Sequence, residues 1–382
     1  MKFFHLSDLH IGLKLFGRDF LEDQRYVFRQ IAEAAQKEKP DAVVVAGDIY
    51  DKAVPSAEAV ALFDFFVSEL TAAVPKAAIM MISGNHDSGP RVNTFRNILS
   101  RQRLYMVGLP PMTNNEYIEK VTLQDEFGDV NFYLLPFVRP SMVKPVIGTD
   151  EEGGSLSYDV ALRRLIGREQ IDDGSRNVLV SHQFYLPAGV VPDEVERTDS
   201  EIRTVGNIDQ VSADVLEQFD YAALGHIHKP MTAGKEVCCY CGTPFPTSVS
   251  EAGQKKGIIL VDLKRKGEVE TTVLPLKPLH EVRVIEGSLK EVLGQTCEDY
   301  VTVKLTDKVD LDVIDMQDRL QAAFPNLLEI RRDTIWRPDY EKRIEEQAKQ
   351  DPFTLCCSFL KDLDDSEKAV LEDVIHTVWE VK

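Results

Sequence analysis

Short apolar runs recur along the first two thirds of the chain, and several of them end at a cluster of polar residues. Amphipathic segments separate these runs, a pattern that predicts buried strands alternating with helices. The runs that precede polar clusters cover residues 3–6, 42–46, 79–82, 178–180 and 221–224. Helices are predicted at 22–37, 56–71 and 91–101, with Ser56 as the N-cap of the second.

Each of these strands is followed by residues that can bind a metal ion. In open α/β sheets, ligands bind beyond the carboxyl ends of the strands. We therefore expect the side chains that follow the five strands to meet at one rim. In chain order they are Asp8 and His10, Asp48, Asn85 and His86, His182, and His226 and His228.

These residues supply carboxylate, amide and imidazole groups without a thiolate, which suits Mn, Fe or Zn at a hydrolytic two-metal centre. Asp8 and His10 are two residues apart, so on a continuing strand they would face the same way and chelate one ion. Asp48 can bridge two ions. Asn85 offers a neutral carbonyl oxygen, His228 is assigned to the first ion, and His182 and His226 are assigned to the second.

His86 is not needed as a ligand, so we expect it to donate a proton to the leaving oxygen or to a phosphate oxygen. His5 lies inside the first strand and is expected in the core or behind the ligands. Any single histidine is more often an ordinary polar residue than a ligand. Five motifs in order, each after a strand, favour a metal centre.

The rest of the chain suggests two further parts. Proline residues at 275 and 278 indicate a linker, and strands and helices alternate from 281 to 331. We expect a main domain at 1–275, a small α+β domain at 279–338 and C-terminal helices at 340–382. Apolar residues recur at helical spacing after Asp365, the expected N-cap. This stripe would bind a partner or fold back on its own domain.

Composition narrows the class of protein. A length of 382 residues suggests two or three domains, and 43% hydrophobic residues can build a large core. Six cysteines without paired C-x-x-C motifs favour reduced thiols over a zinc site. Neither a signal peptide nor an apolar run long enough for a bilayer is evident, so a cytoplasmic protein without a membrane partner is expected.

The net charge of −19 constrains the substrate. A protein that binds DNA alone usually has a basic face, whereas this chain as a whole repels phosphate. Either the substrate is small, or a partner supplies much of the affinity for nucleic acid.

The order D-x-H, G-D-x-x-D, G-N-H-D, H and G-H-x-H resembles the calcineurin-like metallophosphoesterases. Further residues resemble the SbcD family of nuclease subunits within that superfamily. They are Ile11-Gly12, Arg18, Glu22-Asp23-Gln24, Ser200-Glu201, Val205-Gly206, Lys229-Pro230 and Gly242-Thr243-Pro244. Asp51 departs from the pattern, because some relatives carry a catalytic histidine there.

The resemblance implies an α/β fold with a four-layer α-β-β-α domain, a small α+β capping domain and a C-terminal helical segment. It implies Mn2+-dependent cleavage of DNA, as an exonuclease on duplex ends and an endonuclease on single strands and hairpins. The partners it implies are DNA, a second copy of the chain and an SbcC-type coiled-coil ATPase bound by the C-terminal helices. It carries over Asp8, His10, Asp48, Asn85, His182, His226 and His228 as metal ligands and His86 as the residue that orients the phosphate or acts as the acid.

Two other functions compete with this one. A phosphoesterase of small nucleotides or phosphoproteins would fit the acidic composition, but it would need neither the small domain nor the tail. A non-catalytic scaffold for an ATPase would fit the tail, but the complete set of ligands argues against it.

Overall fold

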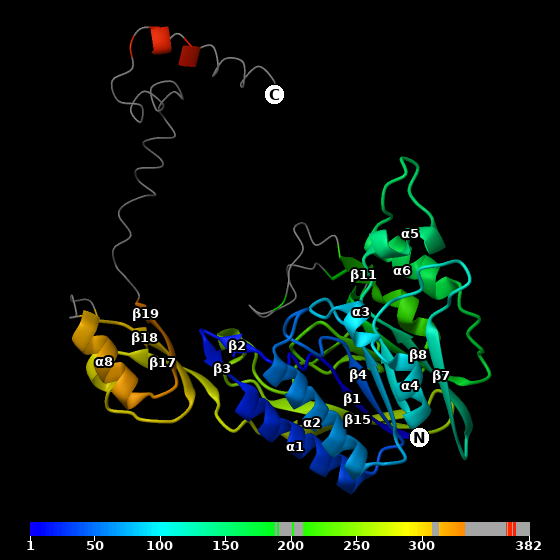
Figure 1. Ribbon diagram of the computed structural model, residues 1–382, viewed down its shortest axis with the longest axis horizontal. Helices are drawn as coiled ribbons and strands as arrows, with labels where there is room; N and C mark the ends of the chain where they lie inside the picture. The colour runs from blue at the N-terminus through cyan, green and yellow to red at the C-terminus, as the bar shows by residue number, and fades with distance from the viewer. Residues whose placement is uncertain are drawn as a thin grey trace.

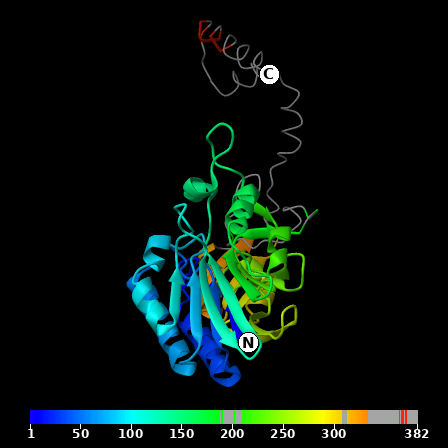
Figure 2. The same cartoon turned by 90° about the vertical axis from the view of Figure 1, so that its right-hand side faces the viewer.

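The computed structural model describes residues 1–187, 189–190, 201, 209–307, 313–332, 364, 366–368 and 370–371. Two six-stranded sheets lie face to face, and helices cover the outer face of each, as Figures 1 and 2 show. This is the predicted four-layer α-β-β-α arrangement. The polar residues predicted to meet at one rim can therefore come from the strand ends of both sheets.

The first sheet has the order β16-β15-β1-β4-β5-β6. Its parallel strands are β1 (Lys2–Leu6), β4 (Ala42–Ala46), β5 (Ala78–Ile82) and β6 (Leu104–Val107). β15 (Lys256–Leu263) and β16 (Val269–Leu276) join it as antiparallel strands. Every residue of β4 and β5 is buried, because both faces of a parallel sheet are covered. That burial explains the uninterrupted apolar runs in the sequence.

The second sheet has the order β13-β14-β12-β9-β8-β7. Its parallel strands are β8 (Gly128–Leu135), β9 (Arg176–His182), β12 (Tyr221–Gly225) and β14 (Cys238–Tyr240). β7 (Glu119–Asp125) and β13 (Met231–Thr232) run antiparallel at its two edges. The carboxyl ends of the parallel strands in both sheets carry the residues of the candidate site.

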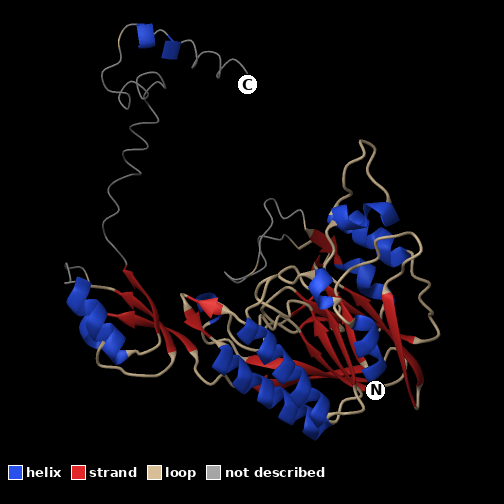
Figure 3. Ribbon diagram, in the orientation of Figure 1, coloured by secondary structure: helices blue, strands red, loops and turns tan. Residues whose placement is uncertain are grey.

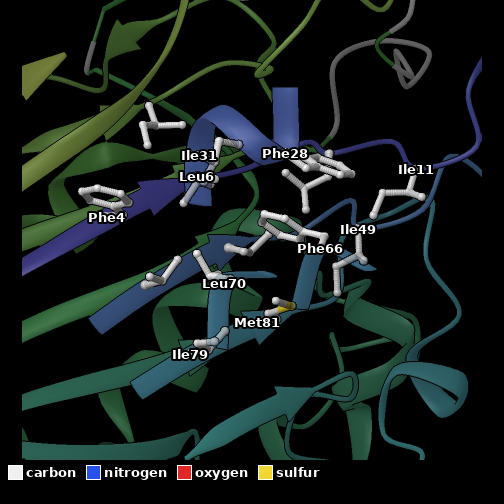
Figure 4. Packing of buried hydrophobic residues seen from close by; sticks show 14 of the residues in the cluster. Phe4, Leu6, Ile11, Phe28, Ile31, Ile49, Phe66, Leu70, Ile79 and Met81 are labelled. Carbon is white, nitrogen blue, oxygen red and sulfur yellow. The ribbon is translucent and has the colours of Figure 1, made fainter. Parts of the chain in front are cut away.

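Three apolar layers hold the sandwich together. Between the sheets, the ring of Phe3 lies 5.3 Å from that of Phe132 and 5.6 Å from that of Tyr221. Outside the first sheet, α1 (Leu21–Glu38) and α2 (Ala57–Ala73) meet through Phe28 and Phe66, whose rings are 4.4 Å apart (Figure 4). α5 (Pro140–Ile147) and α6 (Tyr158–Gly167) cover the second sheet.

The predicted helices are borne out in part. Ser56 caps α2, since its hydroxyl accepts the amide hydrogen of Ala59 at 3.2 Å. The helix predicted at 91–101 is wrong, because Phe95 has a left-handed backbone (φ 60°) that interrupts it. The segment instead forms α3 (Gly89–Val92), α4 (Arg96–Leu99) and the 3-10 helix η1 (Ser100–Gln102).

Short elements complete the main domain. β2 (Lys14–Leu15) and β3 (Arg18–Asp19) form a hairpin, and β10 (Phe184–Leu186) pairs with β11 (Gln210–Ser212). Two 3-10 helices, η4 (Ala213–Gln218) and η5 (Val249–Glu251), follow. Most of residues 187–207 lie outside the described residues.

The linker predicted at 275–278 begins later than expected. Pro275 lies within β16, opposite Gly257, and β16 is an edge strand, where a proline is tolerated. Beyond it, β17 (Val282–Gly287), β18 (Tyr300–Leu305) and β19 (Leu327–Arg332) form a small parallel sheet with α7 (Leu289–Val292) and α8 (Val313–Ala323). This small domain lies beside β2 and β3 (Figures 1 and 3).

The predicted C-terminal helices fall almost entirely outside the described residues. So do Asp365, the expected N-cap, and two of the six cysteines, Cys356 and Cys357. Of the residues described there, 366–368 are helical, and the Asp364 carboxylate accepts the amide hydrogens of Ser366 and Glu367. The four described cysteines are free thiols, as predicted. Among the described helices, none has the length and apolar character needed to cross a bilayer.

Candidate metal centre

The residues predicted to converge do so. Asp8, Asp48 and Asn85 follow the ends of β1, β4 and β5 in the first sheet. His182 ends β9, and His226 directly follows β12 in the second sheet. Sequence-distant side chains therefore gather at one rim where the two sheets meet.

One group consists of Asp8, His10 and His228, whose ligand atoms lie within 4.8 Å of one another. His10 Nε2 and His228 Nε2 are 3.1 Å apart, and His228 Nε2 is 3.9 Å from Asp8 Oδ1. All three residues are buried. These three side chains could hold one ion, and we call them the first half-site.

A second group consists of Asp8, Asp48 and His182. Asn85 lies beside it, with its Oδ1 3.0 Å from His182 Nε2 and 2.9 Å from His226 Nδ1. Asp48 Oδ2 is 3.3 Å from His182 Nε2 and 3.9 Å from His10 Nε2. Asp48 thus faces both groups, the position expected of a bridging carboxylate. We call His182, Asn85 and His226, together with Asp48, the second half-site.

Asp8 and His10 reach the same group by a route that differs from the predicted one. β1 ends at Leu6, so neither residue lies on a continuing strand. Both have left-handed backbones, with φ of 54° and 39°, and Asp48 (48°) and His226 (102°) do as well. L-residues adopt this region at a cost, and such strain concentrates at functional sites. Strand alternation is therefore the wrong explanation for the D-x-H spacing.

The glycines beside the ligands are required by close packing. A Cβ on Gly84 would lie 2.1 Å from Asp48 Oδ1, and one on Gly225 would lie 1.9 Å from the Ala46 carbonyl oxygen. Gly47 has φ +91°, and a Cβ there would lie 2.2 Å from His182 Nδ1. Gly47 thus permits a close approach of its backbone to His182.

Hydrogen bonds fix the tautomer of His182. A carbonyl oxygen can only accept, so the 2.7 Å contact between His182 Nδ1 and the Ala46 carbonyl places the hydrogen on Nδ1. In the neutral ring, the lone pair of Nε2 then points toward Asp48 and Asn85. Metal-binding histidines are usually held in this way by a partner on their second nitrogen.

His86 occupies a different position from the ligands. It is half-buried, its amide donates to Asp48 Oδ1 at 2.8 Å, and its Nδ1 lies 2.9 Å from the Asp51 carbonyl oxygen. Its Nε2 lies 4.0 Å from Asp48 Oδ2, and it forms a potential metal group with His10 and Asp48. Geometry alone thus permits either a ligand or a substrate contact.

His5 lies in the core, as predicted. It is fully buried, its ring nitrogens lie 3.0 Å from the Tyr221 hydroxyl and 3.1 Å from the Leu224 carbonyl, and burial lowers its pKa to about 3. His5 is thus a neutral core residue that joins β1 to β12 behind the metal-binding residues.

Electrostatics favours a cation at this rim. Burial raises the pKa of Asp8 to about 6. Burial would also raise the pKa of Asp48, but His182 and neighbouring histidines hold it well below its usual range. Burial would lower the pKa of His182, but Asp48 raises it to about 9. A buried carboxylate needs a compensating charge, which a proton on imidazole or a metal ion can supply. The donor set therefore fits divalent transition metals.

Sequence reasoning missed several supporting residues. Asp87, quoted only as part of a motif, accepts the amide hydrogens of Ile49, Tyr50 and Gly84 and joins the loops after β4 and β5. Gln24, Glu201 and Glu251 also support the ligands, through bonds to His10, to the His228 amide and to Thr247 respectively. Asp87, Gln24 and Glu201 stand in motifs quoted above, which gave a signal but no role for them, whereas Glu251 stands in none of those motifs.

Comparison with known proteins agrees with this geometry. Residues 1–230 match the family of calcineurin-like phosphoesterases, and residues 278–361 match the type 5 capsule protein repressor C-terminal domain. The SbcD subunit of the nuclease SbcCD from Staphylococcus epidermidis is 30% identical over 372 residues, which cover 96% of this chain and 94% of that protein.

Solved structures with a similar fold are more distant. A dimetal phosphatase from Danio rerio has 16% identity and a TM-score of 0.41, covering 72% of this chain and 99% of its own. A protein of Thermus thermophilus has 13% identity and a TM-score of 0.40, covering 71% of this chain and 98% of its own. The sequence matches span both domains, so the chain belongs to the calcineurin-like phosphoesterases and, within them, to the SbcD family.

Proposed function

We propose that this protein is a manganese-dependent, two-metal DNA nuclease of the SbcCD type that acts in the cytoplasm on DNA ends and hairpins during repair, recombination and replication. The observation that carries the proposal is the convergence of two carboxylates, one amide and four imidazoles around Asp48. The relatedness to a nuclease subunit over 96% of the chain supports DNA as the substrate.

Each side chain has a role in this proposal. Asp8, His10 and His228 hold one ion, Asn85, His182 and His226 hold the other, and Asp48 contacts both. When bound, two divalent ions activate water and offset charge on the phosphate. The Ala46 carbonyl holds a hydrogen on Nδ1 of His182, so Nε2 is the nitrogen that would give up its proton and bind a cation.

His86 contacts the substrate in this proposal. The Asp51 carbonyl accepts from its Nδ1, so a protonated ring would present a second hydrogen on Nε2. That hydrogen would be donated to a phosphate oxygen or to the leaving oxygen. Asp51 contributes its carbonyl to this arrangement, and its carboxylate lies 3.7 Å from His10 Nδ1.

The first prediction is that cleavage of labelled duplex and hairpin DNA requires a transition metal, with manganese the most effective. Imidazole ligands suit manganese, whereas magnesium prefers oxygen ligands and retains its waters. The assay compares manganese with magnesium after transition metals have been stripped, with p-nitrophenyl phosphate and cyclic nucleotides as alternative substrates. Full DNA cleavage in magnesium alone would refute the metal assignment, and turnover of the small substrates without DNA cleavage would refute the nuclease.

His86→Ala should retain both bound ions and cleave DNA at least ~100-fold more slowly, the scale expected for loss of a proton donor or charge stabiliser. Metal content measured on the purified variant separates the two roles that the geometry permits. If the metal content falls together with the activity, His86 is a ligand and its assignment here is wrong.

We also propose a homodimer formed by the helices after the second and third motifs. In α2, Phe66 and Leu70 pack in the core, whereas Val60 is 47% exposed. In the α3–α4 segment, Phe95 is 70% exposed and Ile98 61% exposed. Val60, Phe95 and Ile98 therefore offer apolar surface to a second copy, whereas the buried Phe66 and Leu70 do not.

At micromolar concentration the wild type should have twice the mass of one chain, and Ile98→Glu should shift it to the monomer, because a charge in an apolar interface lacks a partner. Light scattering measures both masses. Val273→Glu is the matched control, since Val273 is 65% exposed on the edge strand β16. A monomeric wild type would contradict the proposal.

A partner bound by the C-terminal segment would explain how a chain of net charge −19 binds DNA. We propose that residues 340–382 form helices that bind an SbcC-type coiled-coil ATPase. The ATPase would supply much of the DNA affinity that a chain of net charge −19 lacks. The domain at 279–338 would cap the nuclease domain.

Deleting residues 345–382 should abolish association with this ATPase and leave manganese-dependent cleavage of short single strands intact, because the metal centre lies entirely in the main domain. Co-purification measures the association. Lys76→Ala, which removes an exposed charge outside the deleted segment, is the control and should bind as the wild type does. Recovery of the truncated chain with the ATPase at full yield would exclude this surface.

A further inference from the structure

His228 of the first half-site is held by a buried chain of hydrogen bonds. Its Nδ1 lies 3.0 Å from the Thr247 hydroxyl, which lies 2.6 Å from Glu251 Oε1. An ionised carboxylate can only accept, so Thr247 donates its single hydrogen to Glu251 and accepts from His228 Nδ1. In the neutral ring, Nε2 of His228 then carries the lone pair on the side that faces Asp8 and His10.

Glu251 is fixed in place by further donors. It is fully buried and accepts from the hydroxyls of Thr243 (2.9 Å) and Ser248 (3.0 Å) and from the Lys256 ammonium. Burial would raise the pKa of Glu251, but the bonds to its neighbours hold it well below its usual range. A buried ion pair satisfied in this way holds one geometry, and removing one partner disturbs it strongly. Glu251 is thus a positioning residue for His228.

Glu251 also belongs to a turn that contacts the small domain. It ends η5, and Val249 of the same turn packs in an apolar cluster. The cluster contains Val282 of β17, Tyr300 of β18 and Leu328 of β19, together with Phe20. The turn that positions His228 therefore rests directly on the small sheet.

A second connection runs through α1. The Tyr300 hydroxyl donates to Asp23 Oδ2 at 2.8 Å, and the His280 amide donates to Asp23 Oδ1 at 2.9 Å. The next residue, Gln24, is fully buried and donates to the His10 carbonyl oxygen at 2.7 Å. Gln24 also accepts the amide hydrogen of Gly12 at 3.0 Å. Contacts from the small domain thus reach His10 through two adjacent residues of one helix.

Both connections end at the first half-site. His10 and His228 are the two imidazoles of that half-site, with Nε2 atoms 3.1 Å apart. In the second half-site, His182 is held by the Ala46 carbonyl at the end of β4, and Asn85 lies between His182 and His226. Those supports belong to the four-layer domain.

We propose that docking of the small domain sets the metal affinity of the first half-site, through Glu251 and Gln24, and leaves the affinity of the second half-site unchanged. A partner that displaces the small domain would then control the occupancy of one ion. The inference rests on the proposed metal centre, but it concerns metal affinity, which is measured without substrate.

Two variants test it. Glu251→Gln removes the charge that orients Thr247 and His228, and Tyr300→Phe removes the hydroxyl that bonds Asp23 while keeping the ring stacked on Phe20. Manganese binding is measured by titration calorimetry and by counting free Mn2+ with electron paramagnetic resonance. Glu251→Gln should weaken one of two sites about 10–100-fold, the usual effect of losing a partner of a metal-binding histidine. Tyr300→Phe should weaken the same site by a smaller factor.

Background variants identify the affected site. In His182→Ala, which impairs the second half-site, Tyr300→Phe should weaken the remaining ion. In His10→Ala, which impairs the first, Tyr300→Phe should have no effect.

Matched controls separate positioning from general loss of stability. Asp125→Asn breaks the bond between Asp125 and the buried Arg176 and should lower the melting temperature with both manganese affinities unchanged. Tyr133→Phe removes a buried hydroxyl that has no hydrogen-bond partner among the described residues and should change neither affinity.

The outcomes are distinct. A wild type that binds no manganese overturns the metal centre and this inference together. A wild type with two ions, whose variants weaken both sites equally or neither, overturns the inference and leaves the metal centre standing. If Glu251→Gln does not fold, as its melting curve would reveal, Tyr300→Phe in the two backgrounds decides the matter alone.

Discussion

The Asp48 carboxylate is the group on which the candidate centre depends. It is 1% exposed, its Oδ1 accepts the amide hydrogen of His86, and its Oδ2 faces His182, His10 and His86 at 3.3, 3.9 and 4.0 Å. An uncompensated carboxylate at such depth would be costly. The compensating imidazoles come from the ends of strands in both sheets, so the apolar layer between the sheets must form before this charge can be buried favourably. Compensation of the Asp48 charge therefore depends on the packing of the core between the two sheets.

The parts of the fold that sequence reasoning predicted are those governed by local pattern. Fully buried parallel strands such as β4 must be apolar along their whole length, and their carboxyl ends must meet at one rim. From the sequence alone, those two constraints predict that Asp8, Asp48, Asn85 and His182 lie together. The break at Phe95 and the extension of β16 through Pro275 were missed, because a left-handed residue and a tolerated edge proline leave no periodic signal.

The support behind the ligands could not be predicted for a different reason. Gln24 reaches the backbone of His10 across a turn, and Glu251 reaches His228 through Thr247, so both act through tertiary contacts. Their residue types are ordinary for a helix and a surface turn, and only burial reveals that they are not solvated. The left-handed backbone of Asp8 and His10 also depends on tertiary contacts, because non-glycine residues adopt it where surrounding contacts impose it.

In the inference above, the small domain supports only the first half-site, and the free energy that this support would need to supply is small. A 10–100-fold change in metal affinity corresponds to about 1.4–2.8 kcal/mol. A few apolar contacts and one buried hydrogen bond, such as those made by Val249 and Tyr300, contribute a similar amount. A protein that binds the small domain therefore needs to redirect only a small part of its binding energy to change the occupancy of one ion. An ion at the second half-site would be held by the two sheets alone and would keep the Asp48 charge compensated. Loss of the ion at the first half-site would then not destabilise the fold.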